Sequence, residues 1–85
     1  MRIPKNDEYV GKIVEFLGGG KVKIEKKDGT CIICRIVGRI RAKKIQIRMN
    51  DYVLIKPWSI EPDKGDIIWR YIQADFGILQ RNNLI

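Results

Sequence analysis

The sequence predicts an all-β domain in which five short strands close into a small barrel. Turn-forming residues recur at short intervals, the segments between them are rich in Val, Ile and Tyr, and one segment alternates strictly between apolar and charged residues. Many short strands with evenly spaced turns are typical of sandwiches and small barrels. We expect one domain over residues 1–85, with the barrel at about 8–72 and a short helix and tail at 73–85.

The first three strands are expected at residues 9–17, 21–25 and 30–36. The second alternates most clearly, because Val22 and Ile24 would face the interior and the charged residues the solvent. Glycines at 18–20 separate the first strand from the second. Asp28-Gly29 suits a tight hairpin turn before the third, since glycine adopts positive φ at low cost.

The last two strands are expected at residues 51–56 and 66–72, with a short additional piece at 45–48. Turns at Asn50-Asp51 and at residues 62–65 precede them. Residues 74–81 could form a short helix, although Gly77 would weaken it by about 1 kcal/mol. A long connection between the third and fourth of five strands favours a barrel of the oligonucleotide-binding (OB) type over an SH3-like barrel.

The charge balance indicates a polyanionic partner. Lys and Arg number 17 against 10 Asp and Glu, which leaves a formal net charge of +7. On so small a domain this excess attracts nucleic acid, although solubility alone is an alternative explanation. There is no apolar run of the roughly 18 residues that span a bilayer, and the first eight residues are too charged for a signal peptide. We therefore expect a cytoplasmic protein without membrane contact.

Nothing in the sequence indicates an enzyme, a cofactor or a metal. The chain has no His, which is the usual acid–base residue and the commonest metal ligand. Cys31 and Cys34 form a lone C-x-x-C, whereas structural zinc needs two further ligands. Three positions apart on a strand, they should face opposite sides. We expect both thiols to be buried as small hydrophobic groups.

The most informative segment is residues 35–48, which contains six basic residues and no acid: Arg35, Arg39, Arg41, Lys43, Lys44 and Arg48. It covers the long connection between the third and fourth strands. OB folds bind oligonucleotides through one sheet face and the adjacent loops, and basic residues there neutralise phosphates. A solvated charged loop is the alternative, but ordinary charged surfaces mix both signs.

Two further features bear on nucleic-acid binding. Lys21 and Lys23 should add to the basic surface from the outer face of the second strand, diluted by Glu25. Trp58 follows Pro57 and could lie exposed as a stacking platform, although aromatic residues in so small a core more often pack inside. Contact with phosphates is therefore favoured over reading of individual bases.

Four segments in chain order resemble archaeal translation initiation factor 1A, a relative of eukaryotic factor 1A and bacterial initiation factor 1. They are GGGKVKI at 18–24, CRIVGRIR at 34–41, PW at 57–58 and DKGDIIWRY at 63–71. The resemblance spans about residues 8–71. It implies an S1-like OB fold that binds the small ribosomal subunit at the decoding A site, blocks premature tRNA entry and supports initiator tRNA placement.

The resemblance also implies partners and contact residues. The partners are small-subunit rRNA and other initiation factors, including the GTPase that promotes subunit joining, and the protein is expected to be a monomer. The family's RNA-contacting positions correspond to Arg39, Arg41, Lys43 and Lys44. Lys64 and Arg70 correspond to basic positions near the same surface.

This sequence departs from the family at several positions. Gln46 stands where the family often has Trp, so a stacking contact there does not carry over, whereas the electrostatic contacts do. Leu84-Ile85 could dock on a partner, with a frayed end as the favoured alternative. Two other functions stay open: a general RNA-binding OB module, and an SH3-like or tudor-like barrel that binds protein.

Overall fold

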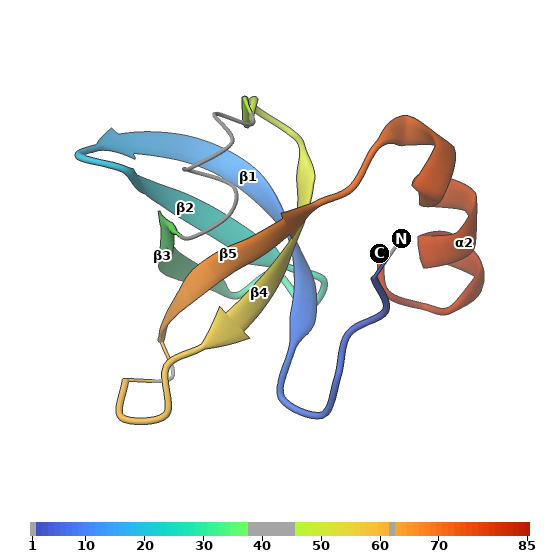
Figure 1. Cartoon of the computed structure of the whole chain (residues 1–85), viewed down its shortest axis with the longest axis horizontal. Coiled ribbons are helices and arrows are strands. Elements are labelled where there is room, and N and C mark those ends of the chain that lie inside the picture. Colours follow the sequence, from blue (N-terminus) through green and yellow to red (C-terminus); the bar gives the residue numbers. More distant parts are fainter. Residues whose placement is uncertain (1, 38–45, 62) are drawn as a thin grey trace.

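The computed structural model describes residues 2–37, 46–61 and 63–85. Within these residues five strands close into a barrel, and a short helical segment follows the last strand (Figure 1). The strands are β1 (Tyr9–Gly18), β2 (Lys21–Lys26), β3 (Cys31–Ile36), β4 (Tyr52–Pro57) and β5 (Lys64–Arg70). The 3₁₀ helix η1 (Gln73–Asp75) and the helix α2 (Phe76–Arg81) come after them. No helix in this part of the chain is long and apolar enough to cross a bilayer.

The strand order around the barrel is β1-β2-β3-β5-β4, and β1 closes it by pairing with both β2 and β4. All neighbouring strands run antiparallel except β3 and β5, which are parallel. This Greek-key arrangement of five strands is the OB architecture. The prediction of an OB barrel with a short helix after it is confirmed.

The barrel interior is filled by the inward-facing residues of all five strands. Val22 and Ile24 are fully buried, as the alternation along β2 predicts. Their neighbours in this cluster include Ile13, Val53 and Ile67, each with no measurable exposure. Branched aliphatic side chains of this size fill the interior of a small barrel.

A second apolar cluster lies between the barrel and α2, where Val10, Leu54, Tyr71 and Leu79 are buried. Leu54 is buried because Leu79 of α2 belongs to the same cluster. The helix α2 lies next to both chain termini (Figure 1). The end of the chain is packed rather than frayed, contrary to the favoured expectation. Leu84 is half-buried against this cluster, and its amide donates to the carbonyl oxygen of Leu79 at 2.9 Å.

The element boundaries differ by more than one residue from the sequence predictions in two places. Residues 46–48 form no strand, and residue 45 lies outside the described part of the chain. A tight turn explains this: the Arg48 amide donates to Asp51 Oδ2 at 2.7 Å, and Asn50 adopts a φ of 70°. The last strand spans Lys64–Arg70 rather than residues 66–72. Its earlier start follows from its parallel pairing with β3, which extends back to Ile33.

Candidate nucleic-acid interface

The outer face of β2 and β3 carries three of the predicted RNA-binding residues. Residues opposite each other in a sheet project from the same face, and Lys21 lies opposite Arg35. Lys23, two residues along β2, projects from this face as well. Lys21 and Arg35 are exposed and Lys23 is half-buried. This strand pair is the surface through which OB folds bind oligonucleotides.

Arg35 is held by two residues from other parts of the chain. Its Nε donates to Asp66 Oδ1 at 2.9 Å, and Trp58 Nε1 donates to the same oxygen at 2.9 Å. The guanidinium carbon of Arg35 lies 4.8 Å from the centroid of the Trp58 ring, within the range of a cation–π interaction. The parallel pairing of β3 with β5 places Asp66 beside Arg35.

Lys64 borders the same region from the start of β5. Its ammonium lies 6.0 Å from the Trp58 ring centroid and forms an ion pair with Glu61 at 3.0 Å. The hydrogen bond and negative charge of Glu61 raise the pKa of Lys64. Lys21, Arg35, Trp58 and Lys64 together line a small hollow on the barrel surface.

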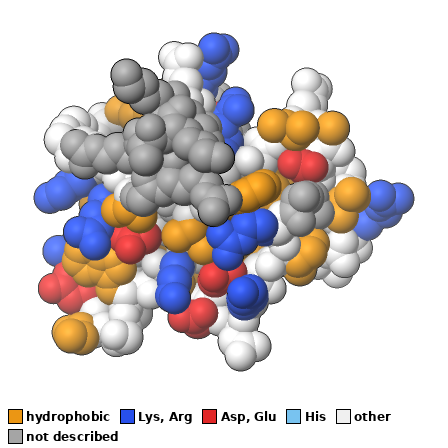
Figure 2. Space-filling model, viewed as in Figure 1, with side chains coloured by type: hydrophobic (Ala, Val, Ile, Leu, Met, Phe, Trp, Pro, Cys, Tyr) orange, Lys and Arg blue, Asp and Glu red, His pale blue; other side chains and the backbone are white. Residues whose placement is uncertain are grey.

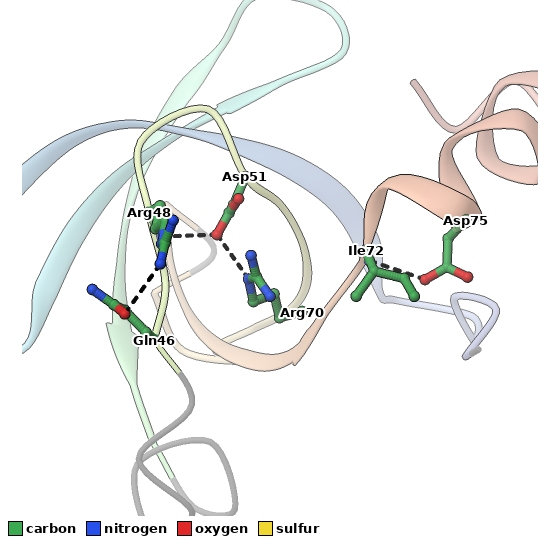
Figure 3. A network of polar contacts seen from close by, with 6 residues as sticks. All are labelled: Gln46, Arg48, Asp51, Arg70, Ile72 and Asp75. Carbon is green, nitrogen blue, oxygen red and sulfur yellow. Dashed lines mark hydrogen bonds and ion pairs between the residues drawn. The ribbon is translucent and has the colours of Figure 1, made fainter.

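Arg48 and Arg70 belong to a separate polar network at the other end of β5 (Figure 3). Arg70 Nε donates to Asp51 Oδ2 at 2.8 Å, the oxygen that also accepts the Arg48 amide. Arg48 Nη2 donates to Gln46 Oε1 at 3.4 Å. The Asp51 side chain is 17% exposed and that of Arg70 29%. Arg70 therefore ties the turn before β4 to the end of β5, and its charge is largely matched.

The predicted site residues thus divide into three sets. Lys21, Lys23, Arg35 and Lys64 lie on or beside one face, and Arg48 lies with Arg70 in the other network. The remaining four, Arg39, Arg41, Lys43 and Lys44, lie outside the described residues. The structure therefore places six of the ten.

Acidic partners are the feature that sequence reasoning missed. Asp66, Glu61 and Asp51 each pair with a residue predicted to bind RNA. Figure 2 shows the same mixture, with Asp and Glu side chains between the Lys and Arg side chains of the visible face. Only the Lys64–Glu61 pair has a local sequence signal, since its members are three residues apart. The other two pairs depend on which strands become neighbours.

The two thiols face opposite sides of β3, as predicted. Cys34 is 1% exposed, and its burial, followed by the charge of Asp66, raises its pKa to about 12. Cys31 is exposed, so the expectation that both thiols are buried is wrong for this residue. Among the described residues, no group of three or more His, Cys, Asp or Glu side chains is placed to hold a metal ion.

Comparison with known proteins gives matches over the whole chain. The family model for translation initiation factor 1A / IF-1 matches residues 1–85. Translation initiation factor 1A of Archaeoglobus fulgidus is 38% identical, over 100% of this chain and 89% of the relative. The Methanopyrus kandleri factor is 37% identical, over 95% of this chain and 72% of the relative.

The solved structures agree on the fold. The solution structure of translation initiation factor 1 from the Wolbachia endosymbiont of Brugia malayi superimposes with a TM-score of 0.65 and 27% identity. The match covers 81% of this chain and 82% of that one. With the OB barrel and its basic outer face, these matches show that the chain belongs to the translation initiation factor 1A / IF-1 family.

Proposed function

We propose that this protein binds the small ribosomal subunit at the decoding A site, where it blocks premature tRNA entry and supports placement of the initiator tRNA. Family membership makes it a translation initiation factor and not an enzyme. The finer role rests on the resemblance of its sequence segments to archaeal factor 1A. The other initiation factors, including the subunit-joining GTPase, are its proposed partners, and the cytoplasm its proposed location.

The observation that carries the proposal is the position of the basic residues on the barrel. Lys21, Lys23 and Arg35 project from the face that OB folds use for oligonucleotides, and Arg35 lies just before the segment that contains Arg39 and Arg41. Cations along one face neutralise phosphates and release counterions, so binding should weaken as salt rises. An excess of +7 also accelerates encounter with RNA.

The proposal is tested by measuring the affinity of labelled protein for purified archaeal small subunits, large subunits and unstructured RNA across a salt series. We expect tight binding to small subunits alone, in competition with ligands of the A site. Equal affinity for all three, falling steeply with salt, would reduce the function to that of a general RNA-binding OB module.

A double variant tests the basic segment. Arg39→Ala with Arg41→Ala should weaken binding to small subunits by about a hundredfold or more, since each hydrogen bond to a charged group contributes roughly 1.5–3 kcal/mol and about 1.4 kcal/mol is tenfold in affinity. The matched control is Lys5→Ala with Arg81→Ala, which removes the same charge from exposed residues outside this face. Equal affinity of a folded Arg39/Arg41 variant and the control would refute the role of these arginines.

A further inference from the structure

We propose that Arg35, Trp58 and Asp66 form one phosphate-binding unit, in which Arg35 contacts an RNA phosphate and the other two residues position it. This inference rests on the proposed function and adds a division of roles within its binding face. The unit draws on three elements, because Arg35 comes from β3, Asp66 from β5 and Trp58 from the connection between β4 and β5.

The guanidinium of Arg35 is oriented on two sides. Its central carbon lies 4.8 Å from the centroid of the Trp58 ring, and its Nε donates to Asp66 Oδ1 at 2.9 Å. Trp58 Nε1 donates to that same oxygen, so the ring and the carboxylate also hold each other. An arginine on a flexible stem normally loses rotamer freedom when it binds an anion. Here the surrounding residues have already restricted it.

The end of this guanidinium stays available for a ligand. Within the described residues, only its Nε makes a hydrogen bond, which leaves the pair of terminal amino groups, Nη1 and Nη2. Two parallel N–H donors in a fixed plane match two oxygens of a phosphate. The Arg35 side chain is 54% exposed, and Lys21 and Lys64 line the same hollow. Their charges also favour an anion over a neutral ligand.

The Arg35–Asp66 ion pair contributes little to stability. An ion pair with one partner 54% exposed adds little to the free energy of unfolding, because water screens it. Asp66 should moreover repel a phosphate bound nearby. Asp66 also accepts the hydrogen bond from Trp58 Nε1. Apart from that bond, its presence on this face is unfavourable for RNA binding unless it serves to orient Arg35.

The Asp66→Ala variant tests this inference, because the charge effect and the loss of orientation should change its affinity in opposite directions. Asp66→Ala raises the formal net charge of +7 by one, so electrostatics alone would tighten binding to small subunits. If Asp66 positions Arg35, the affinity should instead fall by about two- to tenfold, the expected cost of ordering one flexible side chain. The matched control is Glu25→Ala, which removes one exposed acid from the outer face of β2. It should leave the affinity equal or slightly higher.

The salt dependence separates contact from positioning. Arg35→Ala should lower the slope of log affinity against log salt by about 0.7–0.9, because one phosphate contact is lost. Asp66→Ala should leave that slope unchanged, since Arg35 keeps its charge. Arg35→Lys keeps the charge but loses the two parallel N–H donors of the guanidinium, so it should bind more weakly than the wild type. It provides the test if Asp66→Ala does not fold by circular dichroism.

The outcomes are distinguishable from those for the proposed function. Weaker binding of Asp66→Ala beside unchanged binding of Glu25→Ala would support the unit. Wild-type preference for small subunits, with Asp66→Ala behaving as Glu25→Ala or Arg35→Lys binding as tightly as the wild type, would overturn this inference alone. Loss of the preference in the wild type would instead refute the proposed function.

Discussion

Gly65 of β5 lies opposite Pro57 of β4, in a position that leaves no room for a side chain. A Cβ there would lie 2.8 Å from Ile55 Cγ2 and 3.0 Å from the Lys56 carbonyl oxygen. Gly65→Ala should therefore lower the free energy of unfolding by about 1–3 kcal/mol, as overpacking does. Urea unfolding measures this change.

A second glycine provides the control. A Cβ at Gly77 in α2 would meet nothing within 4 Å. Gly77→Ala should raise the free energy of unfolding by about 0.5–1 kcal/mol, because alanine has less freedom to lose on folding. Equal stability of the Gly65→Ala variant and the wild type would show that the strands are not packed as closely as described.

Two buried tyrosine hydroxyls differ in their hydrogen bonding among the described residues, which predicts different effects of their removal. Tyr71 is 1% exposed and donates to the carbonyl oxygen of Arg2 at 2.6 Å. Tyr71→Phe should lower the free energy of unfolding by about 1 kcal/mol. The buried hydroxyl of Tyr9 has no partner among the described residues, so Tyr9→Phe should be neutral or stabilising. Thermal unfolding of the two variants tests this, and equal losses would contradict it.

At the scale of an element, β3 shows how strand alternation separates two identical groups. Cys31 points outward and Cys34 inward, and burial raises the pKa of Cys34 to about 12. A thiol reagent at pH 8 should therefore modify one thiol quickly and the second only on unfolding, because the reactive form is the thiolate. The absorbance of the chromophore that the reagent releases measures how many thiols have reacted in each phase. Cys31→Ser should abolish the fast phase, and a fast phase that survives would contradict the assignment.

The strand β4 shows what alternation alone does not reveal. Three consecutive residues, Val53, Leu54 and Ile55, are all fully buried. A strand with one solvated face would expose the middle one. Leu54 is covered because it packs in the cluster that includes Leu79 of α2. The short helix thus completes the core by covering a part of the barrel that the strands leave open.

At the scale of the whole molecule, buried acidic groups predict how stability depends on pH. Burial raises the pKa of Tyr71 from 10.0 to about 12 and that of Cys34 from 9.0 to about 12. A raised pKa means that the folded state holds its proton more tightly than the unfolded state. Stability is therefore complete below about pH 9 and is lost as the pH rises toward 12.

Urea midpoints between pH 8 and 12 would measure this loss. Tyr71→Phe removes one of these groups, so its midpoint should fall less steeply with pH than that of the wild type. A wild-type midpoint that stays constant up to pH 12 would contradict the burial of both groups. Burial also raises the pKa of Tyr9, so the midpoint of Tyr9→Phe should likewise fall less steeply with pH than that of the wild type.

Much of the fold follows from local patterns in the sequence. The alternation of Val22 and Ile24 with lysines, and the turn at Asp28-Gly29, predict β2 and its hairpin, because period and turn chemistry act between near neighbours. The positions of Lys21 and Lys23 on an outer face follow in the same way. The excess of basic over acidic residues also needs no structure to be read as an attraction for RNA.

Only the tertiary structure decided which distant residues meet. Asp66 lies 31 residues from Arg35 in the chain, and Arg70 lies 19 residues from Asp51. Both contacts depend on strand order and register, which are set by how the whole apolar core packs. The sequence by itself therefore determined the barrel class and its basic character. The pairing of β5 with β3 and β4 decided which cations are matched by acids.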